Sequence, residues 1–499
     1  MKKFLAFSLS AFLLAGCAVN HAPYTEEEFD ELAQGDRNAL PEQEPFAREI
    51  DLDEAMARAV KYNLKRQVQL MEEELAHNQA ILSKFDLLPS LDVESEWSKR
   101  DNDQILDSYD VNTQTIESSS RINTQRESTA SSAKVVWNIL DFGVSYSIAK
   151  QVADQEMMAK ERRRRAVQEI LRDVREAYWR AVGSGMVEED VDELTEETLK
   201  ALRLSAKTRR QLLRNPEKVL LYQRSLLEFL ARLKEMQAGV VAAKAKLTAL
   251  MGLTPDVVYT LKRPPQVLPI PSLRLTMEEL EQRALRDHPA LREAHYQTRF
   301  AAEEAQKEIK RMFPGLEFSF GPEYDTNKYL HNQSWLSAGA AVSWNLFNLF
   351  SAPRRIETAK QKKELADRQR LELSVALLTR LYVGYAQYEL DVEDFQLAAC
   401  LEDVGAKLND IKERSVRARA SNKLELIRSR VDLLRLQLER TIKYAELQAS
   451  VALLKESSGM NLLPETLPSH DLDTIRAALR EQREQHEENL QYVGRYCGS

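Results

Sequence analysis

Residues 88–97 have the sequence LPSLDVESEW, and residues 313–322 have the sequence FPGLEFSFGP. In both segments, a proline ends a helical stretch and pushes the residue before it toward an extended conformation. The residues that follow alternate between apolar and polar, a period of about 2 in place of the helical period of about 3.6. We therefore predict strands at about 90–100 and at about 315–325.

Each predicted strand is followed by a second alternating segment, at about 130–138 and at about 335–345. These segments end in Trp137 and Trp344, which suit the interfacial belt of a membrane protein. Short alternating strands with aromatic ends are typical of outer-membrane barrels, as are long polar external loops such as residues 101–129. The alternative is a soluble two-stranded hairpin packed on helices.

Both strand pairs lie within an internal repeat, because residues 50–97 align with residues 275–322 without a gap. Each copy begins with a capping box, in which an acidic or hydroxyl residue is followed by glutamate three residues later. A helix of about 35 residues then runs to the proline. The sequence predicts a first repeat over 50–274, a second repeat over 275–460, and a charged tail over 461–499 that lies outside the barrel or is disordered.

A long helical hairpin follows the strands in each repeat, over 143–251 in the first and over 353–457 in the second. Pro353 is well placed at the start of the second hairpin, and Gly183-Ser184-Gly185 is a candidate kink in the first. Leucines at spacings of three, four and seven in the returning helices predict a coiled-coil seam. With 15 glycines among 499 residues and 30% charged residues, the composition predicts a mainly α fold with four strands.

The strands constrain the assembly of the protein. Four strands cannot close a barrel, and open sheet edges are not tolerated in lipid. If these strands lie in a membrane, the protein must be an oligomer. After the N-terminus, no segment is apolar enough for a transmembrane helix. The chain has 70 basic against 78 acidic residues and no basic face, which argues against nucleic-acid binding.

The N-terminus has the pattern of an export signal, with two lysines before an apolar run that ends in Leu14-Ala15-Gly16-Cys17. This sequence resembles the bacterial lipobox. The resemblance implies a lipoprotein signal peptide over 1–16, a covalent lipid on Cys17 and a lipidated tether over 17–49. Alanine rather than aspartate follows the cysteine, which implies the outer membrane. The alternative is an ordinary signal peptide with a chance cysteine.

The ordered motifs of the two repeats resemble those of the TolC-like outer-membrane efflux family, over residues 50–460. The resemblance rests on the Pro-x-Leu pattern of the first strand and on the tryptophan stretch that ends the second. In the first repeat this stretch is Trp137-Asn138-Ile139-Leu140-Asp141-Phe142-Gly143, which is similar to the family's Trp-x-Leu-Phe-Asp-x-Gly. The second repeat has Phe350 in place of the glycine, so the turn from strand to helix differs there.

The resemblance implies a homotrimer whose strands form a twelve-stranded barrel, continuous with an α-helical tunnel. It implies a passive duct in the outer membrane, with a body that extends into the periplasm. Its partners would be an inner-membrane transporter and a periplasmic adaptor. Drugs are the first expected cargo, and type I protein secretion or metal efflux comes next. The resemblance implies no enzymatic activity and no cofactor beyond the lipid on Cys17.

The tips of the hairpins depart from the family pattern. Family members often carry an Arg-x-Gly-x-x-Ser-like turn that adaptors contact. Here the second turn has Arg419 in place of the glycine and continues to Asn422, and the first turn contains Arg214 and Asn215. The resemblance implies that these four residues contact an adaptor of undetermined class.

The resemblance also implies a ring of acidic residues that narrows the tunnel just after the second tip. Glu425 stands at one such position, and Arg428 stands where a second acid is common. We predict that the change Glu425→Ala raises the cation conductance of the closed duct. The alternative for Glu425 is a solvated helix face.

Motifs of common enzymes are absent from the sequence, which has no P-loop, no Gly-x-Ser-x-Gly and no His-Glu-x-x-His. His288 and His295 share a helix face, but acids and cysteines at metal-binding spacing do not accompany them. Two other classes of protein remain open. One is a lipid-anchored periplasmic adaptor or coiled-coil scaffold, and the other is a lipid-anchored enzyme.

Two further features concern packing. The four arginines over 162–165 are expected to be solvated or paired with acids of a neighbouring subunit. Cys400 lies in a helical segment, where a buried inert thiol is expected. The sequence leaves open whether Cys400 pairs with Cys497.

Overall fold

The computed structural model describes residues 23–39, 43–46, 49–211, 216–254, 256–265, 268–418, 423–464 and 467–490. The chain divides into two compact units, residues 1–47 and residues 48–499, which we call the N-terminal unit and the body. The N-terminal unit contains helix α2 (Glu26–Asn38), whose first turn is held by a capping box of Thr25 and Glu28. We predicted only a tether here, although the pattern Thr-x-x-Glu is a visible helix signal.

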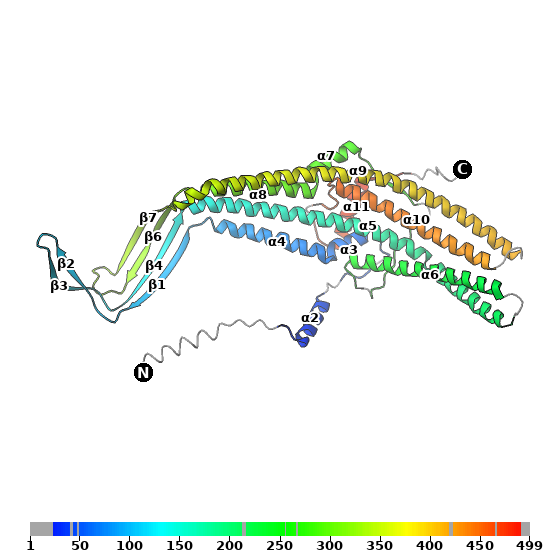
Figure 1. The fold of residues 1–499 in the computed structure, drawn as a ribbon, viewed down its shortest axis with the longest axis horizontal. Coiled ribbons are helices and arrows are strands. Elements are labelled where there is room, and N and C mark those ends of the chain that lie inside the picture. The colour runs from blue at the N-terminus through cyan, green and yellow to red at the C-terminus, as the bar shows by residue number, and fades with distance from the viewer. Residues whose placement is uncertain are drawn as a thin grey trace. The chain divides into compact units, whose positions relative to one another are not determined.

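The body has strands at one end and long helices that run away from them (Figure 1). Two repeats contain the same order of elements. The first consists of α3 (Leu52–Tyr62), α4 (Leu64–Phe85), β1 (Ser90–Lys99), β4 (Glu127–Asn138), α5 (Ile139–Gln211) and α6 (Pro216–Leu250). The second consists of α7 (Met277–Asp287), α8 (Pro289–Lys310), β6 (Gly315–Asp325), β7 (Ser334–Ser343), α9 (Phe347–Arg417) and α10 (Lys423–Ser457). The predicted mainly helical class, with long antiparallel hairpins and a small β part, is confirmed.

The single helix predicted before each proline is wrong, because each is two helices. Asn63 separates α3 from α4 and His288 separates α7 from α8, with extended backbone at ψ 121° and 124°. The Asn63 side chain accepts a hydrogen bond from Lys65 N at 3.0 Å, and His288 Nδ1 accepts one from Ala290 N at 3.2 Å. Each side chain therefore caps the second helix. Pro289 was a visible signal, because proline disfavours a helical conformation at the residue before it.

The polar segment 101–129 is not a loop throughout, which corrects the prediction. It forms the antiparallel strands β2 (Gln104–Asp110) and β3 (Thr115–Thr124), with Gln114 at a φ of 52° in the turn between them. Threonine and isoleucine in this segment favour extended structure, and their signal was outweighed by the many polar residues around them.

The second long hairpin begins earlier than predicted, at Phe347 rather than at Pro353. Asn345, the residue before the N-cap Leu346, accepts a hydrogen bond from Phe347 N with its Oδ1 atom at 3.1 Å and so satisfies the first backbone donor of the helix. Pro353 lies in the second turn, where it removes a single backbone hydrogen bond from a helix of 71 residues. In the first hairpin, α5 is assigned as one helix of 73 residues that passes through Gly183.

The C-terminal tail is folded over much of its length, so the alternative of a disordered segment is wrong, and it lies outside the four-stranded sheet. It forms helix α11 (Leu472–His486), capped by the Asp471 side chain, and strand β8 (Glu487–Leu490). β8 pairs antiparallel with β5 (Ile270–Leu273), which lies between the two repeats. The helix α11 packs on α3. The high charge of the tail concealed this docking, because its charged side chains are paired rather than solvated.

Apolar side chains from α5, α6 and α10 form the largest described core cluster, around Leu226, Leu233 and Ile427. Two smaller clusters lie nearer the strands of the β5–β8 sheet and helix α7. Gly183 allows α5 and α10 to approach closely, because a Cβ atom there would lie 2.3 Å from Cβ of Thr441. The leucines predicted for the coiled-coil seam are not the residues of this core, because Leu220 and Leu227 are 50% and 52% exposed and the neighbouring face of α6 is buried instead.

Candidate functional site

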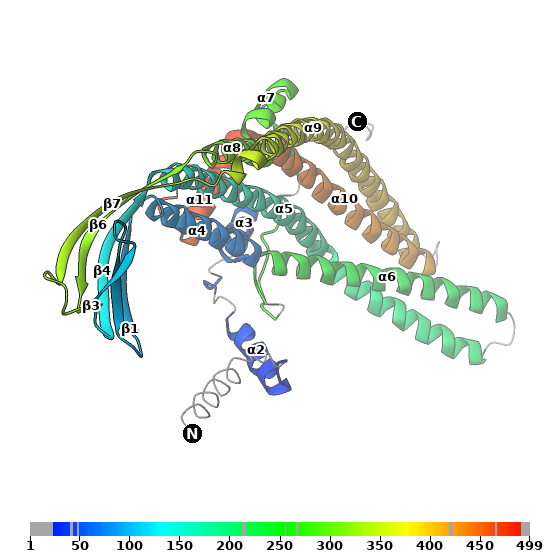
Figure 2. The same ribbon diagram turned by 60° about the vertical axis from the view of Figure 1, so that its left-hand side comes forward.

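The strands β1, β4, β6 and β7 form one antiparallel sheet in the order β1-β4-β6-β7. The two repeats join at β4 and β6, where Val136 lies opposite Ser319. Within the described part of the chain, β1 and β7 each bond to one strand only, so both sides of the sheet are open edges (Figure 2). An edge strand offers a row of unpaired backbone groups to another strand.

The register places most of the large apolar side chains of the four strands on one face. Leu91 lies opposite Val135, Val135 lies opposite Phe320, and Phe320 lies opposite Ala338. Side chains two residues apart along a strand share a face, so this apolar face extends over the whole sheet. Its large members are exposed, as Leu91 is 68% and Val342 is 72% accessible. The opposite face is polar apart from residues such as Val136 and Trp335, and it carries an ion pair of 2.7 Å between Lys134 and Glu323.

Aromatic side chains lie on the apolar face near both ends of the strands. Trp137 and Trp344 lie at the end next to the helices, and Trp97 and Tyr324 lie at the far end. Trp97 is paired with Thr129, and eight residues of β4 separate Thr129 from Trp137, a length of about 26 Å. The apolar band of an outer-membrane barrel is about 25 Å tall between two aromatic girdles.

The helices near the sheet form a layer in which α4 packs on α5, α5 on α8, and α8 on α9. The outer helices of this layer, α4 and α9, expose apolar stripes with the spacing of a coiled-coil seam. On α4, which reaches about 32 Å from the sheet, the stripe consists of Leu64, Val68, Met71, Leu75, Leu82 and Phe85. At this level α9 exposes Phe347, Phe350 and Leu365, and its seam-spaced stripe of Leu397, Leu401, Val404, Leu408 and Ile411 begins about 75 Å from the sheet end of the helix, beyond the level of α4. β1 follows α4 in the chain and β7 precedes α9, so the sheet and the helical layer are open on the same two sides.

Glu425 lies near the start of α10, and its Oε2 atom is 3.5 Å from Nζ of Lys412 on α9. Both side chains are 41% exposed. The expected tip residues Arg214, Asn215, Arg419 and Asn422 lie outside the described residues, as does Cys17.

A network of ion pairs that we did not predict links the two hairpins close to the tips. The Glu197 carboxylate on α5 pairs with Lys423 and Arg430 of α10, at 3.3 and 3.2 Å. Arg430 also pairs with Glu413 of α9 at 3.3 Å. These residues are far apart in the sequence, and local periodicity carries no signal of such pairing.

The arginines over 162–165 are neither free in solvent nor in need of a neighbouring subunit, which corrects the prediction. Arg162 and Arg165 pair with Glu293 of α8, at 2.6 and 3.3 Å. Arg163 pairs with Glu73 of α4, and Arg164 pairs with Glu161 on its own helix at 2.6 Å. Arg162 and Arg165 thus link α5 to α8, and Arg163 links α5 to α4.

Two other sequence expectations concern His288 and Cys400. His288 is buried and caps α8, and burial together with Arg380, Arg165 and Arg164 lowers its pKa to about 4. In the described part of the chain, groups of three or more acids, histidines or cysteines that could hold a metal ion are not found. Cys400 is buried as expected, but it is disulfide-bonded and so not a thiol. The other cysteines, Cys17 and Cys497, lie outside the described residues.

Over the described residues, helices with the length and hydropathy of a membrane span are absent. The four-stranded sheet, the paired long helices and the repeated order of elements together define the fold of the TolC-like outer-membrane channels. The predicted resemblance to this family is confirmed at the level of the fold.

The chain is similar to the CmeC outer membrane channel of Campylobacter jejuni, with a TM-score of 0.65 and 11% identity over 93% of this chain and 97% of that one. It is similar to the outer membrane protein VceC of Vibrio cholerae, with a TM-score of 0.61 and 13% identity over 82% and 96%. The open state of the MtrE channel of Neisseria gonorrhoeae gives 0.58 and 12% over 83% and 96%. No protein-family model and no curated protein matches the sequence.

Proposed function

We propose that this protein is the outer-membrane duct of a tripartite export system, a passive conduit for small molecules such as drugs. Three chains would close a twelve-stranded barrel and a continuous α-helical tunnel. A lipid on Cys17 would anchor the chain in the outer membrane, and the body would extend into the periplasm. The similarity in fold to outer-membrane channels supports this proposal.

The observation that carries the proposal is the pair of open sides. β1 and α4 form one side of the protomer, and β7 and α9 form the other. Two different surfaces that complement each other make head-to-tail contacts, which close into a ring when the rotation between subunits allows it. Joining β1 to β7 of the next subunit would satisfy the open sheet edges, as lipid requires. The same contact would cover the apolar stripe of α4 and the exposed apolar residues Phe347, Phe350 and Leu365 of α9.

The aromatic residues at both ends of the sheet support a membrane position for the strands. Their separation of about 26 Å along β4 agrees with the height of a barrel's apolar band. At the other end of the body, Glu425 would narrow the tunnel, and the tip residues Arg214, Asn215, Arg419 and Asn422 would contact the adaptor. The ion pairs of Glu197 with α10 would hold the closed arrangement of the hairpins.

A photo-crosslinking residue at Met71, in the exposed stripe of α4, tests the ring. We expect crosslinks to α9 of another copy and a ladder that ends at the trimer. The matched control is the same residue at Glu278, which is exposed on α7 and outside the two open sides. Channel conductance in planar bilayers is the second measurement. A monomer without conductance would instead support the periplasmic scaffold.

The same photo-crosslinking residue, placed at Asn422, tests the proposed tripartite assembly in living cells. Capture of an adaptor or transporter, identified by mass spectrometry, is the expected result. The transporter captured would separate drug efflux from type I secretion and metal efflux. Capture of this chain alone would contradict the tripartite assembly.

A further inference from the structure

The C-terminal tail is held on the body by paired charges that are mostly buried. Asp53 on α3 is 3% exposed and accepts hydrogen bonds from Arg483 at 2.9 and 3.0 Å and from Arg480 at 3.1 Å. The neighbouring Asp51 pairs with Arg476 and with Arg480. Charges removed from water remain favourable only when they are fully paired, so these contacts specify one position for α11 on α3.

Glu487, the first residue of β8, connects the tail to both repeats. Its Oε2 atom accepts a hydrogen bond from Nη2 of Arg175 on α5 at 3.0 Å. Its Oε1 atom lies 2.6 Å from Nζ of Lys455 on α10. The Glu487 side chain is 8% exposed, and those of Arg175 and Lys455 are 4% and 3% exposed. One buried carboxylate from the tail thus joins the long helix of the first repeat to the returning helix of the second.

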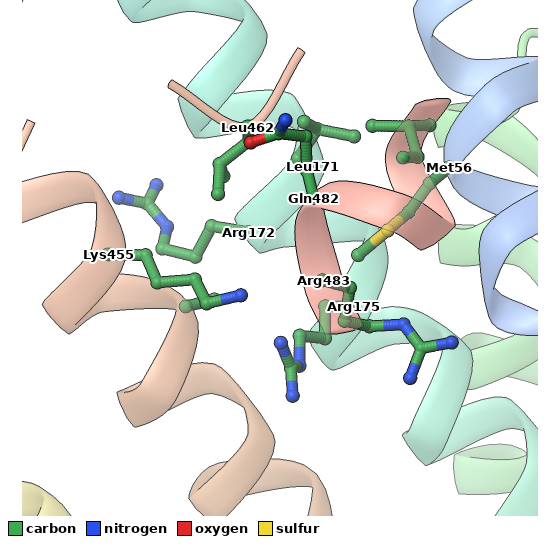
Figure 3. A pocket seen from close by; sticks show the side chains of 10 residues that line it. Met56, Leu171, Arg172, Arg175, Lys455, Leu462, Gln482 and Arg483 are labelled. Atoms are coloured by element: carbon green, nitrogen blue, oxygen red, sulfur yellow. The ribbon is translucent and has the colours of Figure 1, made fainter. Parts of the chain in front are cut away.

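A second buried carboxylate acts at the same level of the body. Glu456, which is 4% exposed, pairs with Arg172 of α5 at 2.5 Å and with Arg380 of α9 at 2.8 Å. Together, Lys455 and Glu456 place one turn of α10 in ionic contact with α5, α9 and the tail. Figure 3 shows the cationic residues of this region around a cavity of about 30 Å³, room for about one water.

The electrostatics of this cluster favour the paired state. Arg175 and Lys455 hold the pKa of the Glu487 carboxyl well below its usual range, in spite of burial. Burial, together with Arg175, lowers the pKa of Lys455 to about 8, although Glu487 favours its charged form. The carboxylate is therefore ionised at neutral pH, and its removal would leave two cations buried with reduced compensation.

The ion pairs between α5 and α10 become more exposed toward the tips, where an apolar core around Val191 and Ile427 also joins the two helices. Gly183 touches Thr441 closely, about 12 Å along α5 from Arg175. From Gly183 to Gln211, α5 continues for about 42 Å. Over this length the described ion pairs to α10 are those of Glu197, whose partners Lys423 and Arg430 are 63% and 36% exposed. Partly exposed pairs contribute little stability, so toward the tips α5 and α10 are joined mainly by apolar packing, whereas at the level of Arg175 and Lys455 they are joined by buried ion pairs.

We propose that the α11–β8 segment is a latch that fixes the pivot of the two hairpins, with the Glu487 carboxylate as the pin between α5 and α10. This inference rests on the proposed function in one respect, because movement about the pivot would open the tunnel. A turn of about 10° at the level of Gly183 would move the end of α5 by about 7 Å. The pin limits this turn, because α5 and α10 cannot slide past each other while both bind one carboxylate.

The test uses full-length protein with spin-labelled noncanonical residues, and it measures distances by electron–electron resonance. One pair of labels, at Lys200 of α5 and Arg428 of α10, reports on the tip region. A second pair, at Glu189 of α5 and Glu439 of α10, reports on the level of the pivot. Glu487→Gln is the test variant, and Glu484→Gln is the matched control, because Glu484 is exposed on the same tail.

We expect Glu487→Gln to lengthen the mean distance of the tip pair by about 5 Å or more and to change the pivot pair much less. Glu484→Gln should leave both distances at the wild-type values. If Glu487→Gln fails to fold, the triple variant Arg175→Met, Lys455→Met, Glu487→Leu removes the buried charges together and should show the same lengthening. An unchanged tip distance in a folded variant overturns the latch.

The proposed latch and the proposed duct can be contradicted independently of each other. The distances are measured in the protein itself, without a transporter or cargo. Longer tip distances in a protein that never conducts would contradict the duct and keep the latch. Unchanged tip distances in a conducting trimer would contradict the latch alone.

Discussion

The first helices of the two repeats, α3 and α7, occupy equivalent places in the body and have opposite surroundings. Both contain 11 residues and begin at a capped N-terminus. All of α3 except Lys61 is buried, whereas α7 buries only Leu280 and Ala284. α3 packs on both α11 and α5, whereas α11 has no described counterpart on α7.

The sequences of the two helices already encode this difference. Met56 and Ala57 in α3 correspond to Glu281 and Gln282 in α7, by the alignment of 50–97 with 275–322. The internal repeat therefore preserves the path of the backbone, while the side chains have diverged around a single C-terminal tail. One docked segment makes the two halves of the body physically inequivalent.

The largest expected effect comes from the acid at the second position of these helices. Asp53→Ala would leave Arg480 with Asp51 alone and remove the carboxylate that Arg483 binds. Because the two arginines are 46% and 32% exposed, the expected cost is about 2–3 kcal/mol of the free energy of unfolding. Glu278→Ala, the matched change on α7, should alter it by less than about 0.5 kcal/mol. Urea unfolding followed by circular dichroism measures both. Equal losses in the free energy of unfolding for the two variants would contradict a special role of the acid on α3.

The residues between the paired helices, Asn63 in the first repeat and His288 in the second, predict a different response of stability to pH. His288 has a pKa of about 4 in the folded state, below the value of about 6.5 expected on unfolding, so the folded protein favours the neutral ring. Its contribution is complete above pH 6.5 and is lost as the pH falls toward 4. We expect a loss of about 2 kcal/mol between pH 7 and pH 5.

The control for this prediction is His288→Asn, which reproduces the cap that Asn63 supplies in the first repeat. This variant should keep the helix cap and lose that part of the pH dependence. Thermal unfolding at pH 7 and pH 5 compares the two proteins. A variant with the wild-type pH dependence would show that other groups cause it.

The smallest expected effect separates two glycines of the long helices. Gly183→Ala would force α5 away from Thr441, and the strain of about 2 kcal/mol exceeds the gain of about 1 kcal/mol in helix propensity. Gly384→Ala in α9 would meet Leu454 at 3.6 Å, an ordinary contact, and should stabilise by up to about 1 kcal/mol. Opposite signs in urea unfolding are the expected outcome, and a stabilising Gly183→Ala would contradict the close approach.

Local patterns predicted the parts of the fold that depend on local chemistry. The change of period after Pro89 and Pro314 located all four strands of the sheet to within a few residues. The breaks at Asn63 and His288 were missed, because a side-chain cap within a helical run produces little change in periodicity. The docking of α11 was missed because pairs such as Asp53 with Arg483 join residues at opposite ends of the chain.

The candidate site also contains features that the sequence predicts and features that it does not. The apolar face of the sheet followed from alternation, and the register then showed that four strands contribute to one face. The network of Glu197, Arg430 and Glu413 could not be predicted, because no spacing rule relates residues on three different helices. The position of Glu425 beside Lys412 depends on the same packing of α9 against α10.

The two unlike open sides of the protomer have a genetic consequence. In the proposed trimer, a subunit damaged in the stripe of α4 would still present an intact α9, so it would join a growing ring and prevent its closure. When damaged and normal chains are produced in equal amounts, only about one trimer in eight would contain normal chains alone. Alleles altered on one side would therefore be dominant, whereas alleles that prevent folding would be recessive.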